Sequence, residues 1–81
     1  MRIKVTEEDI AEGTRCCNTS CPVANAALRT SRESTVSCGT ASIRIGDRRY
    51  ILPDSVGARI KRFDETGIME PFEFELTCIL K

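Results

Sequence analysis

The fold is decided by residues 35–52, which read Thr35-Val36-Ser37-Cys38-Gly39-Thr40-Ala41-Ser42-Ile43-Arg44-Ile45-Gly46-Asp47-Arg48-Arg49-Tyr50-Ile51-Leu52. Apolar and polar residues alternate along three short runs, as they do in strands with one buried face. Two glycine-led dipeptides separate the runs, and glycine at the first position of a two-residue loop is typical of a type II′ hairpin. The stretch therefore predicts a three-stranded antiparallel meander.

Each turn sets a register. The first turn predicts Cys38 opposite Ala41, the second predicts Ile45 opposite Arg48, and both glycines are expected to need a positive φ. Both registers put the same apolar residues on one face of the sheet, and a slip of one residue would move them all to solvent. The predicted inward set is Val36, Cys38, Ala41, Ile43, Ile45, Tyr50 and Leu52.

The segment before the meander predicts one strand and two helices. Residues 2–5 alternate, with Ile3 and Val5 inward. Residues 6–13 form a short helix that begins with a capping box of Thr6 and Asp9. Pro22 is suited to the first position of a second helix over residues 22–30, with Cys21 or Ser20 as the cap.

The segment after the meander predicts a helix and a strand. Pro53 begins a helix over residues 53–65, which ends at Gly67. Alternation returns after Pro71 and predicts a single strand with five inward residues, Phe72, Phe74, Leu76, Cys78 and Leu80.

The predicted order of elements is β-α-α-β-β-β-α-β. It indicates an α+β fold with a small, mostly antiparallel sheet of about five strands and with helices packed on one face. A chain of 81 residues has room for one domain, over residues 1–81.

Composition excludes several classes of function. Twelve Lys+Arg balance twelve Asp+Glu, so we expect no bulk nucleic-acid binding. The chain has no His, which removes the commonest general base and metal ligand, and it has no Trp and one Tyr for an aromatic cage. No apolar run is long enough to span a bilayer, and the first residues do not read as a signal peptide. We expect a cytoplasmic protein that is not an enzyme and has no cofactor and no membrane partner.

The five cysteines are the first candidates for chemistry. In the cytosol they are expected to be reduced or metal-bound. Cys17-x-x-x-Cys21 falls within the spacing of some zinc sites, but two CxxC pairs are absent, and Cys38 and Cys78 are predicted to face the core. We expect no bound metal, and a zinc module that uses Cys16, Cys17 and Cys21 stays the alternative. Cys21 also begins a helix, where its thiolate is favoured.

Two places are candidates for binding an anion. The first is the start of the second helix, where free N–H groups combine with Arg15, Thr19 and Ser20. The second is the outer face of the meander, where Arg44 lies opposite Arg49. Like charges placed opposite one another destabilise a sheet unless an anion compensates them.

The compensating anion has two possible sources. Glu73 and Glu75 would supply it if the last strand lies beside the meander, and we favour that internal pairing. An external phosphate or carboxylate would supply it otherwise, because Arg binds both in a bidentate way. Arg48 at the turn, and Arg59 and Arg62 on the last helix, would widen such a patch.

Five strings of this sequence, in order, resemble a group of short, uncharacterised proteins encoded by tailed bacteriophages. The resemblance covers most of the chain, and its motifs are structural rather than catalytic. The strings are Ile3-Lys4-Val5-Thr6, Cys21-Pro22-Val23-Ala24, Ile43-Arg44-Ile45-Gly46-Asp47-Arg48-Arg49-Tyr50, Pro53-x-x-Val56-x-x-x-Ile60-x-x-Phe63-Asp64 and Glu70-Pro71-Phe72-Glu73-Phe74-Glu75-Leu76.

The resemblance implies a phage accessory protein in the host bacterial cytoplasm. Small proteins of that class bind a host component stoichiometrically, and counter-defence proteins among them sequester a nucleotide signal or inhibit a host protein. We therefore expect a non-enzymatic binding protein whose partner is a host protein or a small anionic ligand such as a nucleotide. Ile51 and Ile79 fall on the face away from the inward set, which predicts a homodimer or a higher homo-oligomer.

Overall fold

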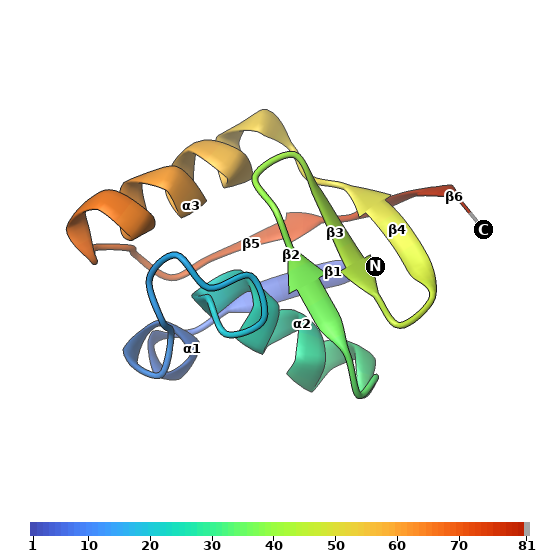
Figure 1. Ribbon diagram of the computed structural model, residues 1–81, viewed down its shortest axis with the longest axis horizontal. Helices are drawn as coiled ribbons and strands as arrows, with labels where there is room; N and C mark the ends of the chain where they lie inside the picture. The colour runs from blue at the N-terminus through green and yellow to red at the C-terminus, as the bar shows by residue number, and fades with distance from the viewer. Residues whose placement is uncertain (81) are drawn as a thin grey trace.

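The computed structural model describes the backbone of residues 1–80 and the side chains of residues 1–76. It has the α+β class that the sequence predicts, with antiparallel pairing between all of its described strands. In chain order the elements are β1 (Arg2–Val5), α1 (Glu7–Ala11), α2 (Pro22–Ser31), β2 (Val36–Cys38), β3 (Ser42–Ile45), β4 (Arg48–Ile51), α3 (Asp54–Thr66), β5 (Phe72–Glu75) and β6 (Thr77–Leu80) (Figure 1).

The strands form two sheets rather than one. β1 pairs with β5 in a two-stranded sheet, and the second sheet has the order β2-β3-β4-β6. The chain passes from one sheet to the other at Leu76, whose side chain is buried and whose N–H donates to the Met1 carbonyl oxygen at 2.7 Å. The prediction of one last strand is therefore wrong, because alternation is the same whether a run stays in one sheet or crosses between two that share a core. Phe74 is buried and Phe72 half-buried, whereas Cys78 and Leu80 lie outside the described side chains.

The second turn of the meander has the predicted register. Ile45 lies opposite Arg48, and Gly46 has a φ of 63°. The first turn is longer than predicted, because Cys38 lies opposite Ile43 and the Gly39 N–H donates to the Ser42 carbonyl oxygen at 2.9 Å. Gly39 is not one of the described residues that have a positive φ.

The error in the first turn is a shift of two residues, so it leaves the buried face unchanged. Val36, Cys38, Ile43, Ile45, Tyr50 and Leu52 are all buried as predicted. Ala41 alone leaves the predicted inward set, since it lies exposed in the longer loop.

The helices begin and end close to the predicted residues. α1 begins with the capping box of Thr6 and Asp9, and Cys21 caps α2 by accepting the Ala24 N–H at its Sγ, 3.4 Å away. α3 ends at Gly67, whose φ is 75°. Among the described residues no helix has both the length and the apolar character needed to span a bilayer.

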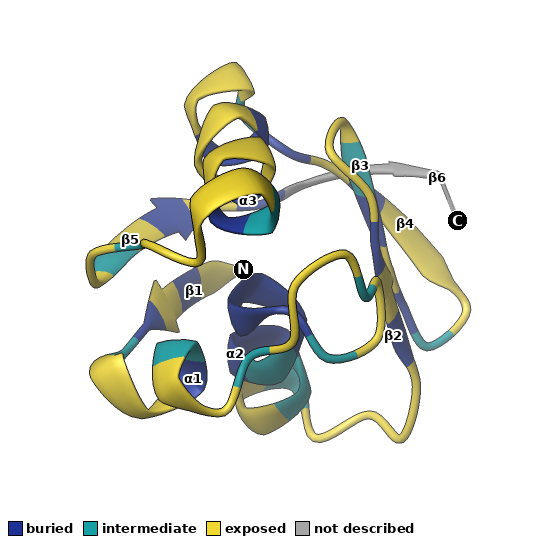
Figure 2. Cartoon of the chain, turned by 60° about the vertical axis from the view of Figure 1, so that its left-hand side comes forward, coloured by how far each residue is buried: buried dark blue, intermediate teal, exposed yellow. Residues whose placement is uncertain are grey.

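One apolar core joins both sheets to α2 and α3. β1 contributes Ile3 and Val5, and the inner face of the second sheet contributes the meander residues named above. α2 and α3 lie on the inner side of the second sheet (Figure 2) and contribute small or branched side chains to the core, whereas Ser37, Arg44 and Arg49 on the opposite face are exposed. The helical contributors are Val23, Ala24, Ala26, Ala27, Val56 and Ile60.

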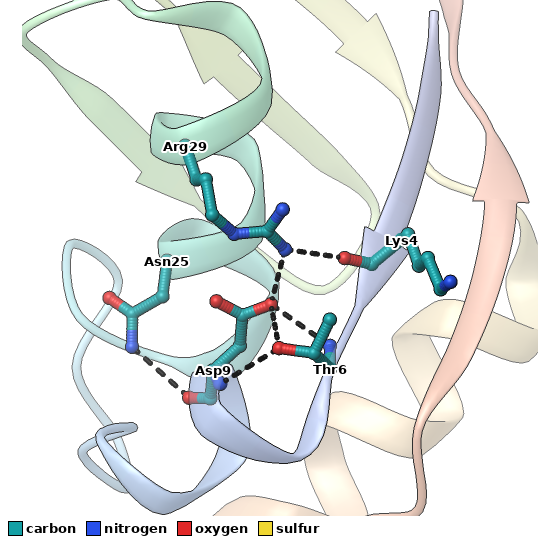
Figure 3. A network of polar contacts seen from close by, with 5 residues as sticks. All are labelled: Lys4, Thr6, Asp9, Asn25 and Arg29. Atoms are coloured by element: carbon teal, nitrogen blue, oxygen red, sulfur yellow. Dashed lines mark hydrogen bonds and ion pairs between the residues drawn. The ribbon is translucent and has the colours of Figure 1, made fainter.

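A buried carboxylate ties α1 to α2 and β1. Asp9 is buried, and its Oδ2 accepts from Arg29 Nη2 at 2.7 Å, from the Thr6 N–H at 2.9 Å and from Thr6 Oγ1 at 3.0 Å. Arg29 also donates to the Lys4 carbonyl oxygen, and the Asn25 amide donates to the Asp9 carbonyl oxygen (Figure 3). Burial alone would raise the pKa of Asp9, but the hydrogen bonds from Arg29 and Thr6 outweigh it and hold that pKa below its ordinary value.

Candidate functional site

The exposed face of the meander carries two arginines side by side. Arg44 on β3 lies opposite Arg49 on β4, as the sequence predicts, and Ser37 on β2 lies opposite Arg44 on its other side. All three residues are exposed. The row therefore runs straight across three neighbouring strands, with the two arginines at paired positions.

A second row lies beside the first. Ser42 on β3 pairs with Ile51 on β4, and 49% of Ile51 is exposed. We call Ser37, Ser42, Arg44, Arg49 and Ile51 the outer face. It offers two cationic groups, two hydroxyls and one apolar side chain to a partner.

The acids predicted to neutralise the arginine pair lie in the other sheet. Glu73 pairs with Lys4 across β5 and β1, and Glu75 pairs with Arg2. Glu75 Oε2 lies 3.3 Å from the Met1 amino group, and Glu75 Oε1 lies 3.5 Å from Arg2 Nη2. The favoured internal pairing is therefore wrong, because the chain changes sheets at Leu76 and brings β6 rather than β5 beside β4.

No carboxylate in residues 1–76 forms an ion pair with Arg44 or Arg49. The ion pairs in that part of the chain join Met1 and Arg2 to Glu75, and Arg29 to Asp9. The arginine pair thus keeps its repulsion within the described side chains, and an external anion would relieve it.

The other arginines that were expected to widen the patch point elsewhere. Arg48 lies opposite Ile45, one residue out of phase with Arg49, so alternation puts it on the other side of the sheet at the turn. Arg59 has its guanidinium carbon 4.5 Å from the centre of the Phe72 ring. Arg62 lies with Arg59 along a groove between α3 and the segment after it.

The residues predicted to hold an anion at the start of α2 are not brought together there. Arg15 donates from Nε to the Asp64 carbonyl oxygen at 3.1 Å and from Nη2 to the Glu65 carbonyl oxygen at 2.7 Å, so its charge stabilises the carboxyl end of α3. Thr19 lies with its Oγ1 3.5 Å from the Cys17 Sγ. The backbone of Ser20 closes the loop, since its N–H donates to Cys17 and its carbonyl oxygen accepts from Thr14.

A cavity of about 320 Å³ lies between α2, α3 and the start of the first meander turn. Four thiols line it: Cys16 and Cys17 from the loop, Cys21 from the start of α2, and Cys38 from the end of β2. Asp64 of α3 also lines the cavity, and its Oδ1 accepts the Cys16 N–H at 2.8 Å. Cys16 is exposed and Cys17 half-buried, whereas Cys21 and Cys38 are buried.

The two buried thiols are unequal in acidity. The neighbouring Cys38 thiol, together with the backbone N–H groups of Ala24 and Val23, lowers the pKa of Cys21 to about 7 against the opposing effect of burial. The same pairing with Cys21, together with burial, raises the pKa of Cys38. Cys38 Sγ also lies 3.3 Å from the Gly39 carbonyl oxygen, which accepts its proton. The pair therefore favours one thiolate at Cys21 with the remaining proton on Cys38.

The positions of these cysteines also test the alternative that the chain is a zinc module. Cys16, Cys17 and Cys21 do line one cavity, but within the described residues no three Cys, Asp or Glu side chains are grouped so that they could hold a metal ion.

Sequence reasoning found the arginine pair but missed the convergence of the thiols. It placed Cys38 inward and Cys21 at a helix start, without bringing the two together. Cys21 and Cys38 are 17 positions apart and lie on different elements. The one local signal of a reactive thiol is the cap position of Cys21 before Pro22.

The chain matches no protein-family model, no curated protein and no solved structure.

Proposed function

We propose that this chain is a non-enzymatic binding protein whose outer face holds an acidic surface of a partner protein. The observation that carries the proposal is the Arg44 and Arg49 pair, side by side on β3 and β4 with no acidic partner in residues 1–76. Bringing two like charges together on a rigid sheet costs free energy, and a carboxylate that bridges both guanidinium groups recovers it.

The position of the arginine pair favours a protein over a nucleotide as the ligand, because neither Arg44 nor Arg49 lines any of the cavities described in residues 1–76. Small-molecule sites are concave and enclose most of their ligand. The arginine pair lies instead on the exposed face of a sheet, with Ser37 and Ser42 as hydroxyl donors and Ile51 as an apolar contact. Arg is enriched in protein interfaces, so an exposed arginine pair is suited to a protein partner.

The resemblance to short phage proteins supports the choice of partner. An accessory protein of a phage acts in the host bacterial cytoplasm, and inhibition of a host protein needs only stoichiometric binding. We therefore propose a host protein with an acidic patch as the target, and counter-defence as the biological role.

The test uses two defined probes on the isotope-labelled protein: a peptide of alternating Glu and Ser, and a cyclic dinucleotide. We expect the peptide to shift the amide resonances of Ser37, Arg44 and Arg49, and we expect added salt to weaken the effect because the site is exposed. The cyclic dinucleotide should give no saturable shift at these amides.

Two charge-matched variants separate the outer face from general basicity. Arg44→Gln with Arg49→Gln should abolish the peptide shifts while leaving the fold intact. Arg48→Gln with Arg62→Gln removes the same charge away from the outer face and should preserve them. Equal loss in both variants would defeat the proposal, and a saturable dinucleotide titration at the same amides would replace the protein target with a nucleotide.

A further inference from the structure

The four-thiol cavity is separate from the outer face. Cys38 ends β2 with its side chain on the inner side of the sheet, whereas its neighbour Ser37 belongs to the outer face. Nothing in the proposed binding function uses the thiols.

Cys21 has the surroundings of a nucleophilic thiol. Its Sγ accepts the Ala24 N–H at the amino end of α2, where the helix dipole and free N–H groups stabilise a negative charge. The thiolate is the form that attacks a disulfide, and a thiol whose pKa lies near the ambient pH reacts fastest. The pKa of Cys21, lowered to about 7 mainly by the neighbouring Cys38 thiol, meets that condition.

Cys38 is placed to act as the second thiol. It lines the same cavity as Cys21, it is buried, and its raised pKa keeps its proton in place while Cys21 is ionised. A buried thiol next to a thiolate is the arrangement in which a mixed disulfide on the first sulfur is resolved by the second.

The cavity gives a small reagent a path to the pair. Its lining joins exposed Cys16 and half-buried Cys17 to the two buried thiols. The titratable groups that face the pair are Cys16 and Cys17 from the loop and Asp64 from α3. The negative charge of Asp64 opposes the Cys21 thiolate, and the hydrogen bonds to Cys21 outweigh it.

We propose that Cys21 and Cys38 form a redox-active dithiol, which a low-molecular-weight disulfide oxidises to an intramolecular disulfide. The Cys21 thiolate attacks one sulfur of the reagent, so a mixed disulfide forms and one small thiolate leaves and takes up a proton. Cys38 then gives up its proton and attacks the Cys21 sulfur, which releases the second small thiolate. Two electrons pass from the protein dithiol to the reagent, which departs as two thiols.

The experiment treats the reduced full chain with cystamine, a disulfide small enough for the cavity, and then blocks remaining thiols with an alkylating agent. With one equivalent of cystamine we expect the intact mass to fall by two hydrogens before alkylation, and we expect two of the five cysteines to remain unalkylated after it. Trypsin should then release residues 16–29 joined to residues 33–44 through a disulfide. A link that involves residues 63–81 instead would overturn the assignment, because that peptide carries Cys78.

Variants identify the two sulfurs. Cys16→Ser with Cys17→Ser leaves Cys21 as the one cysteine of residues 16–29, and the link to residues 33–44 should form as in the parent. Cys38→Ala should stop the reaction at a mixed disulfide between Cys21 and one cysteamine. Cys21→Ser keeps an oxygen at the cap position and should give no link.

Two results would overturn the proposal. One is loss of the link in the Cys16 and Cys17 double variant, which would assign the reaction to the exposed thiols. The other is a link that forms only after the chain is unfolded in denaturant, which would show that the native cavity does not bring Cys21 and Cys38 into reaction. Circular dichroism of each variant provides the control for folding.

Discussion

At the scale of single residues, Asp9 shows how one buried charge fixes the junction of three elements. Its carboxylate accepts from Arg29 on α2 and from Thr6 before α1, and the same Arg29 nitrogen reaches the β1 backbone at Lys4. The capping box of Thr6 and Asp9 could be predicted, because it is a local pattern of two residues. The contribution of Arg29 could not, because it depends on how α2 packs against α1.

Replacing Arg29 should therefore destabilise the fold. Arg29→Met leaves the Asp9 carboxylate without its cationic partner, and we expect the free energy of unfolding to fall by about 1–3 kcal/mol at neutral pH. Urea unfolding would measure the difference. Arg62→Met, which removes a charge from the exposed side of α3, is the matched control and should have little effect.

The pH dependence of that difference follows from the pKa of Asp9. The fold lowers this pKa below its ordinary value of 3.8, so the stabilisation is fully present above 3.8 and is lost as the pH falls through the lower value in the folded state. The difference in the free energy of unfolding between the parent chain and Arg29→Met should decrease over that acidic range. A difference that stays constant would mean that Arg29 stabilises the fold by packing rather than by charge.

At the scale of elements, the two turns of the meander depend on their glycines to different degrees. Gly46 has a φ of 63°, a left-handed conformation that costs other residues about 1–2 kcal/mol. Gly46→Ala should lower stability by that amount. Gly39 lacks a positive φ, and a Cβ there would lie 3.3 Å from the Ser42 carbonyl oxygen, so Gly39→Ala should be the milder change. Equal thermal shifts in the two variants would contradict this assignment of the turns.

The contact between α3 and the first turn depends on a third glycine. A Cβ at Gly57 would overlap the Thr40 carbonyl oxygen, which is backbone and has little room to move. Alanine is normally the better helix former by about 1 kcal/mol. Gly57→Ala should nevertheless destabilise the protein, by about 1–3 kcal/mol, because α3 must shift away from the turn. A gain in melting temperature would show that α3 does not pack on Thr40.

At the scale of the whole molecule, the outer face leaves an apolar group in solvent. Ile51 is 49% exposed beside the arginine pair, and Ile79, the other residue expected on that face, lies outside the described side chains. We predict that, in the absence of an acidic partner, the chain self-associates through this face, since burying apolar surface gains about 25 cal/mol per Å².

Sedimentation at high protein concentration tests that prediction. Ile51→Asp should give a monomer, while Ile68→Asp, at a similarly exposed position after α3, should leave the association unchanged. A parent chain that sediments as a monomer would refute self-association. The outer face would then be accessible to the proposed partner without competition from a second copy of the chain.

The sequence by itself determined the features that depend on neighbouring residues. Alternation set the buried faces of the strands, Gly46 set the register of one hairpin, and Thr6, Pro22 and Gly67 set helix ends. Each of these is decided by backbone sterics or by hydrogen bonds within a few residues. The Arg44 and Arg49 pair follows from that hairpin register and was predictable for the same reason.

The tertiary structure alone decided which distant segments meet. The sequence alternates in the same way whether residues 72–80 form one strand or cross between two sheets, so only packing could separate Glu73 and Glu75 from the arginines. Likewise, the inward direction of Cys38 was a local property, but its pairing with Cys21 depends on α2 lying against β2. Strand partners and helix docking are chosen by the shared core, whose contacts join residues far apart in the chain, and no local pattern encodes that choice.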